Sequence, residues 1–159
     1  MDDVRRNALF PFLLTRAVLP QLRKASGPTQ MVYIGSYAGE SRLPRLIPYG
    51  ATKAFLKQMS GALASDERFR NPRNNVTTMY VIVGSVASGS HKISPTFFSP
   101  SSEVYAKALV DKIGCGKRVI SPYLPHALQM FFVRSMPESI VNMVEMQSME
   151  EELKMYHNN

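Results

Sequence analysis

The chain has 159 residues, of which 45% are hydrophobic and 19% are charged, so its apolar side chains suffice for one core of ordinary size. Its longest apolar runs are far shorter than the roughly 20 residues of a membrane-spanning helix, and it shows no repeat of fixed period. Its one cysteine, Cys115, excludes an intramolecular disulfide. We therefore expect an ordinary globular domain without a transmembrane span.

The net charge of +7 is unevenly distributed. Residues 1–134 hold 18 Lys and Arg against 7 Asp and Glu, whereas residues 135–159 hold 1 against 5. A basic body can attract nucleic acid, anionic lipid or a phosphorylated small molecule. Because the cations are scattered singly and not interleaved with aromatic residues, we expect no nucleic-acid binding.

The first predicted helix starts at a cap at Asp2 or Asp3 and ends at Gly27-Pro28. The apolar surface of this helix is wide, so we expect the helix to be buried on two sides. The apolar side chains follow two adjoining stripes at helical spacing, Leu9, Leu13 and Ala17 in one and Phe10, Leu14, Val18 and Leu22 in the other.

Two buried strands and a second helix are predicted further along the chain. Residues 31–34 and 76–83 are short apolar and β-branched runs typical of strands buried on both faces. Between them lie a proline-bearing loop over residues 37–48 and a helix over residues 49–70, which Asn71-Pro72 ends.

A third unit of helix and strand follows Gly84. The sequence predicts a polar stretch over residues 85–102, a helix over residues 103–113 and a short strand over residues 118–120. Strands that alternate with helices predict a parallel sheet with helices on both faces, a three-layer α/β fold with three strands. We expect this domain to occupy residues 1–122.

Residues 123–159 are expected to form an extension of that domain. A Met-rich amphipathic segment extends to residue 149, and the polar end after it is expected to fray. Such a segment packs on a core or on a dimer partner. Residues 123–149 are alternatively a candidate for peripheral contact with a membrane.

The chemistry is concentrated at Ser36, Tyr49 and Lys53. A spacing of four on a helix places the Tyr49 phenol and the Lys53 ammonium on one face, one turn apart. A nearby ammonium favours a phenolate, which makes a tyrosine a usable proton donor and acceptor. Ser36 follows the carboxyl end of a predicted strand, where open parallel sheets bind ligands, so its hydroxyl can hold a carbonyl oxygen beside the tyrosine.

The runs Ile34-Gly35-Ser36 and Tyr49-Gly50-Ala51-Thr52-Lys53-Ala54-Phe55 resemble the short-chain dehydrogenase/reductase superfamily. The run Leu14-Thr15-Arg16-Ala17-Val18-Leu19-Pro20 is similar to its steroid dehydrogenase and very-long-chain 3-oxoacyl-CoA reductase branch. This resemblance covers most of residues 5–121 and implies a Rossmann-like doubly wound parallel sheet. It also implies reduction of a ketone on a fatty-acyl-CoA or steroid-like lipid, with NADPH, or alternatively NADH, as cofactor.

The resemblance assigns a role to each of the three residues. Tyr49 is the proton donor, Ser36 orients the substrate oxygen, and Lys53 assists the tyrosine and binds the nicotinamide ribose. In the family, the main-chain carbonyl of a helix asparagine, which falls on Asn7, holds a water that links the lysine to solvent. Pro11 supplies an independent reason, since proline has no N–H to bond the carbonyl four residues earlier. The alternative remains open that Pro11 simply begins the regular helix and that Asn7 is a loop residue or cap.

Residues 83–88 resemble the family's nicotinamide-contacting stretch, usually Pro-Gly-x-Val-x-Thr. Val83 replaces the proline and Ser88 replaces the threonine. Because those contacts use main-chain groups, the resemblance implies that Gly84 and Val86 bind the cofactor.

A Gly-rich turn between a strand and a helix, which would bind a pyrophosphate, is absent from the sequence. The resemblance therefore implies the C-terminal part of the family's domain, an N-terminally incomplete fold that leaves residues 31–34 as an exposed apolar edge. The alternative hypothesis is a non-catalytic truncated fragment or interaction protein that lacks its nucleotide site.

The remaining expectations concern metals, partners and location. His91, His126 and His157 have no ligand spacing, so we expect no metal site. The helices at residues 8–24 and 49–70 are candidate surfaces for a homodimer. The resemblance implies a location at the endoplasmic reticulum or in the cytoplasm.

Overall fold

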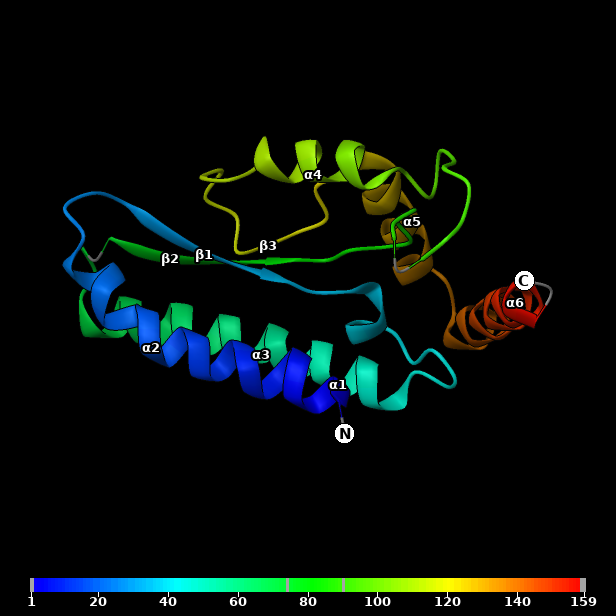
Figure 1. Cartoon of the computed structure of the whole chain (residues 1–159), viewed down its shortest axis with the longest axis horizontal. Coiled ribbons are helices and arrows are strands. Elements are labelled where there is room, and N and C mark those ends of the chain that lie inside the picture. Colours follow the sequence, from blue (N-terminus) through cyan, green and yellow to red (C-terminus); the bar gives the residue numbers. More distant parts are fainter. Residues whose placement is uncertain (1, 74, 90, 158–159) are drawn as a thin grey trace.

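A computed structural model describes residues 2–73, 75–89 and 91–157 of the chain. A parallel sheet of three strands lies at its centre, with helices on both faces (Figure 1). The strands lie in the order β1-β2-β3 and comprise Thr29–Ile34, Val76–Val81 and Val119–Ile120. The expected three-layer parallel α/β fold is thus confirmed.

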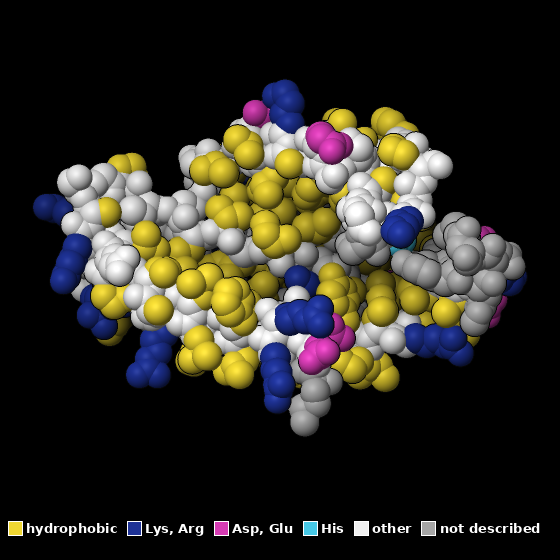
Figure 2. Space-filling model, viewed as in Figure 1, with side chains coloured by type: hydrophobic (Ala, Val, Ile, Leu, Met, Phe, Trp, Pro, Cys, Tyr) yellow, Lys and Arg dark blue, Asp and Glu magenta, His cyan; other side chains and the backbone are white. Residues whose placement is uncertain are grey.

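The first predicted helix consists of three consecutive helical segments. α1 (Asp2–Val4) leads into a π-helical segment, η1 (Arg5–Leu9), which continues as α2 (Phe10–Lys24). In α2 only Thr15 is buried. The expectation of burial on two sides is therefore wrong for the described chain, since one face of α2 packs towards the sheet and the other is exposed (Figure 2). The exposed apolar residues of α2 include Phe10, Phe12, Leu13 and Leu14, and Leu9 at the end of η1 is exposed as well.

The second predicted helix is α3 (Ile47–Arg70), which starts two residues earlier than the sequence predicted. Pro48 lies in its first turn, where a missing N–H costs nothing because the first amides of a helix have no acceptor in the helix. α2 and α3 cover the same face of the sheet (Figure 1). A buried ion pair between Arg23 and Glu67 links the two helices.

β2 is the buried strand on which the core is built. Met79, Tyr80 and Val81 are each 0% exposed. Successive side chains of a strand point to opposite faces, and accordingly Tyr80 belongs to a cluster with Tyr33 and Leu56, while Met79 and Val81 belong to a second cluster. β1 forms one edge of the described sheet, and its last residue, Ile34, is 48% exposed, which agrees with the expected exposed edge.

The opposite face of the sheet carries α4 (Ser102–Val110), capped by the hydroxyl of Ser101 (Figure 1). The Met-rich extension forms two helices, α5 (Leu124–Ser135) and α6 (Glu138–His157), with Met136 and Pro137 between them. The expected fraying of the polar end is wrong up to His157, because α6 continues through it, while the last two residues of the chain lie outside the described residues. Every helix of the described chain falls short, in length or apolar character, of what a bilayer span requires.

Candidate active site

The candidate site is a cavity of about 660 Å³ at the carboxyl ends of β1 and β2. Ser36, Tyr49, Gly84 and Val86 all line it. They come from three separate segments, namely the turn after β1, the first turn of α3 and the turn after β2. The structure therefore brings four of the predicted site residues together at the edge of the sheet where open α/β proteins bind ligands.

Ser36 lies two residues after the end of β1 and caps a 3-10 turn, η2 (Tyr37–Gly39). The Gly35 N–H donates to the Val81 carbonyl at 2.8 Å, so the ladder with β2 continues beyond the strand. The Oγ of Ser36 accepts a hydrogen bond from the Ala38 N–H at 3.2 Å. Because this bond uses a lone pair of the hydroxyl, the hydroxyl proton remains to be donated to a ligand.

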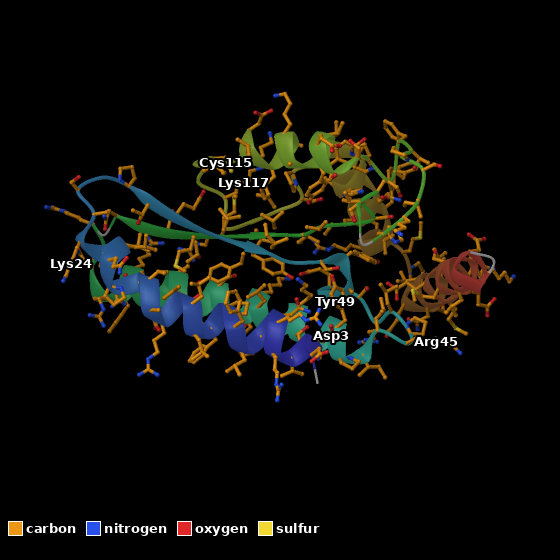
Figure 3. All side chains as sticks on the ribbon, viewed as in Figure 1. Asp3, Lys24, Arg45, Tyr49, Cys115 and Lys117 are labelled. Atoms are coloured by element: carbon orange, nitrogen blue, oxygen red, sulfur yellow. The ribbon has the colours of Figure 1, made fainter. Side chains whose placement is uncertain are left out.

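Tyr49 and Lys53 lie on the face of α3 that approaches this turn. The Lys53 ammonium lies 5.5 Å from the centroid of the Tyr49 ring, which confirms that the two side chains share one face of the helix. Lys53 also donates to the carbonyl of Ile34, the last residue of β1, at 3.1 Å. Burial lowers the pKa of Lys53 below its usual value, and the nearby carboxylate of Asp3 partly offsets this effect. Figure 3 shows Asp3 and Tyr49 on the same side of the sheet.

Gly39 explains how closely the serine turn approaches α3. A Cβ at Gly39 would lie 2.8 Å from the main-chain carbon of Lys53 and 2.9 Å from the amide nitrogen of Ala54. Such distances leave no room for a side chain, so only glycine permits this contact. The close packing fixes the serine turn against the part of the helix that carries Lys53.

Asn7 lies inside the π-helical segment η1, which contacts α3. The Phe10 N–H donates to the carbonyl of Arg5, five residues earlier, as in a π-helix. Pro11 lies in the first turn of α2, as the alternative interpretation expected, but Asn7 is neither a loop residue nor a cap. The interpretation of Asn7 as a loop residue or cap is therefore wrong, while its role towards Lys53 remains a prediction.

Known proteins identify the family. The profile of the short chain dehydrogenase family matches residues 2–95, more than half of the chain. The chain belongs to this family. A very-long-chain 3-oxoacyl-CoA reductase-like protein of Arabidopsis thaliana is 32% identical over 131 residues, which are 81% of this chain and 42% of that protein. An inactive hydroxysteroid dehydrogenase-like protein of Pongo abelii is 27% identical over 139 residues, 86% of this chain and 41% of that protein.

A solved structure with the same fold is the short-chain dehydrogenase of Sphingobium yanoikuyae in complex with NADPH. It superimposes with a TM-score of 0.61 at 19% identity, over 85% of this chain and 56% of that one. The chain thus contains part of a doubly wound, Rossmann-like fold, and it spans about two fifths of the length of the curated relatives named above.

Sequence reasoning missed His126 as a cavity residue; it lines the cavity from α5 and is only 2% exposed. Its Nε2 lies 3.0 Å from the Phe98 carbonyl, so Nε2 carries a proton. Burial lowers the pKa of the imidazole, although the main chain of Phe98 and of Ser85 raises it in part. Nδ1 has no partner of hydrogen-bond geometry in the described structure. Within the described ranges no three His, Cys, Asp or Glu side chains gather to hold a metal ion.

Glu145 of α6 is a second cavity residue that the sequence did not reveal. It is 6% exposed, and the hydroxyl of Tyr37 donates to its Oε1 at 3.0 Å. Burial and the carboxylate together raise the pKa of Tyr37, so this phenol stays protonated. The one available signal was the spacing of four residues between Glu145 and Met149, which places both on one face of the helix.

Proposed function

We propose that this chain carries the catalytic part of an NAD(P)H-dependent reductase of lipid ketones, with Ser36, Tyr49 and Lys53 as its catalytic residues. One observation carries this proposal. The Tyr49 phenol and the Ser36 hydroxyl line one cavity, and the Lys53 ammonium lies 5.5 Å from the ring of that phenol.

The residues around the cavity fit the nicotinamide end of the cofactor. A volume of about 660 Å³ lies within the range of small-molecule sites. The turn after β2 offers main-chain groups of Gly84 and Val86 to the carboxamide, and Lys53 has donors left for a ribose hydroxyl after its bond to Ile34. When bound, the nicotinamide supplies the hydride.

Each side chain then has a defined task. Ser36 donates its hydroxyl proton to the substrate carbonyl oxygen and holds that oxygen next to Tyr49. Tyr49 gives its phenolic proton to the same oxygen as negative charge develops there. The positive charge of Lys53 stabilises the phenolate that remains. The Asn7 carbonyl, in the π-helical segment before Pro11, holds a water through which Lys53 passes protons from solvent.

The lining of the cavity supports a fatty-acyl or steroid-like substrate. Away from Ser36 and Tyr49, it is formed mostly by apolar side chains of α5, α6 and the loop before α3, which can bury an alkyl chain or a fused ring. NADPH is the cofactor we favour, by resemblance to the family branch. The apolar lining residues of α5, α6, the link between them and the loop before α3 are Leu43, Leu46, Met130, Val133, Met136, Val141, Val144 and Met149.

We propose that the exposed face of α2, with α3 beside it, forms a homodimer. Large apolar side chains on a water-exposed helix mark an interaction surface, and Phe10 is 62% exposed and Phe55 of α3 44%. Residues 123–159 are proposed as a unit distinct from residues 1–122. Within it, residues 123–149 expose Phe131 at 67% and Phe132 at 57%, which favours contact with a lipid surface and a location at the endoplasmic reticulum.

A non-catalytic function is the second candidate. The sequence offers no Gly-rich turn for a pyrophosphate, so the described cavity can hold only part of a dinucleotide. A chain with a formed cavity but no cofactor affinity would act as an interaction protein.

NADPH titration of the purified chain separates the two functions. Reductase function predicts saturable binding, followed by NADPH fluorescence, and weaker binding by Lys53→Met because a ribose donor is lost. The matched control is Lys107→Met on α4, whose ammonium pairs with Asp111 at an exposed position. Flat titrations of the unsubstituted chain would refute the reductase and favour the interaction protein.

A further inference from the structure

A buried phenol lies directly behind the candidate site. Tyr80 is in the middle of the sheet on β2 and is 0% exposed. Its hydroxyl donates to the main-chain carbonyl of Lys53 at 3.1 Å and accepts a long hydrogen bond from the Ser36 N–H at 3.4 Å. One oxygen atom thus joins the main chains of two residues that we place in catalysis.

The ring of Tyr80 also packs closely against the main chain that leads into Ser36. A Cβ at Gly35 would lie 2.1 Å from the Cζ of Tyr80 and 2.3 Å from its hydroxyl oxygen. No side chain can occupy that position while the phenol is there. The main chain that leads into Ser36 therefore lies on the phenol itself, without an intervening side chain.

The hydroxyl, and not only the ring, has a structural task. Burying an unpaired hydroxyl is costly. The Tyr80 hydroxyl avoids this cost because it donates its single proton in one hydrogen bond and accepts another through a lone pair. Burial raises the pKa of Tyr80 to about 12, so it keeps the proton that it donates to Lys53 throughout the neutral range. A phenylalanine would fill the same space but would leave both main-chain groups without this partner.

We propose that Tyr80 is a positioning residue, whose hydroxyl holds the Ser36 turn and the Lys53 turn of α3 at a fixed spacing, so that Ser36 lines the cavity while the Lys53 ammonium stays beside the Tyr49 ring. Tyr80 does not line the cavity and acts only through the residues it holds. The inference rests on the proposed reductase function for its catalytic consequence, but the spacing itself is a property of the fold.

Tyr33 provides a matched control. It is a tyrosine of the neighbouring strand β1 in the same core cluster, 6% exposed, and its hydroxyl pairs with Thr15 at 2.9 Å instead of with a site residue. Tyr80→Phe and Tyr33→Phe therefore each remove one buried hydroxyl from the same core.

Amide hydrogen exchange of Ser36 tests the spacing without any need for activity. Loss of a hydrogen bond of about 1 kcal/mol corresponds to an increase of about fivefold in exchange. Tyr80→Phe should show this increase at Ser36, and Tyr33→Phe should leave the Ser36 amide unchanged. Equal exchange in Tyr80→Phe and the unsubstituted chain, or an equal increase in both variants, would overturn the proposal.

Steady-state reduction of a lipid ketone by NADPH tests the catalytic consequence. We expect kcat to fall about tenfold in Tyr80→Phe, with the NADPH dissociation constant unchanged, and to stay within twofold in Tyr33→Phe. A kcat unaffected by Tyr80→Phe would overturn the positioning role. If the unsubstituted chain reduces nothing, the proposed function fails, whereas the exchange at Ser36 still decides the structural role of Tyr80.

Discussion

The ion pair between α2 and α3 allows a quantitative test of the packing that places the site. Glu67 is 2% exposed and is held by Arg23 in a forked arrangement, with the guanidinium Nε 3.1 Å from Oε1 and 3.2 Å from Oε2. Arg23→Met would remove the cation, keep an unbranched side chain of moderate length and leave the carboxylate buried without its partner.

We expect this variant to lose about 3 kcal/mol of the free energy of unfolding. Breaking a buried ion pair on one side costs roughly 3–5 kcal/mol, and the lower end applies because the Arg23 side chain is 32% exposed and its charge is partly screened. Replacing both partners, in Arg23→Met with Glu67→Leu, removes the unpaired charge and should recover stability to within about 1 kcal/mol of the original.

Urea denaturation followed by circular dichroism measures both variants, with Arg16→Met at an exposed position of α2 as the control. A loss below about 1 kcal/mol at pH 7, or a double variant as unstable as the single one, would refute the reasoning.

Three further predictions concern the site and its surroundings. Burial lowers the pKa of His126 below its usual 6.5, so the unfolded chain binds the proton more readily and stability should decline as the pH falls below 6.5. In urea denaturation, His126→Gln should flatten this decline. An equal slope in the variant would count against a buried neutral imidazole. Burial also lowers the pKa of Lys53, so kcat should decline with rising pH before the usual 10.5 is reached. Lys53→Arg, which keeps its charge, should move this decline to higher pH. If the decline occurs at the same pH in the variant, it belongs to another group. Leu13→Glu, at a position 49% exposed on α2, should convert the proposed dimer to a monomer in sedimentation and change stability by less than about 0.5 kcal/mol, whereas Val110→Glu on α4 should leave the dimer intact. A dimer that persists in Leu13→Glu would place the interface elsewhere.

Local patterns in the sequence were sufficient to predict most of the architecture. The short apolar run around Val32 predicted a strand, and helical spacing predicted that Tyr49 and Lys53 share a face of α3. Both features depend on residues close together in the chain. The start of α3 was misplaced by two residues because Pro48, read as part of a loop, occupies the first turn of the helix.

Contacts over long sequence separations could not be predicted in this way. Tyr80 lies 44 residues from Ser36, and Tyr37 lies 108 residues from Glu145, so no local spacing indicates either hydrogen bond. These contacts follow from how the turns after β1 and β2 and the helix α6 pack together. The one-sided burial of α2 was missed for a related reason, since an apolar stripe does not show whether the same chain or another molecule covers it.

In the proposed reaction, the Tyr49 phenol transfers the proton to the substrate. The most direct measurement compares NADPH-dependent ketone reduction and NADPH binding in Tyr49→Phe with those in Tyr37→Phe, a second tyrosine that lines the same cavity. We expect Tyr49→Phe to lose reduction by at least about 100-fold, within the range of general acid catalysis, while NADPH binding stays within a few-fold and Tyr37→Phe keeps most of its turnover. Undiminished reduction by Tyr49→Phe would rule out Tyr49 as the proton donor.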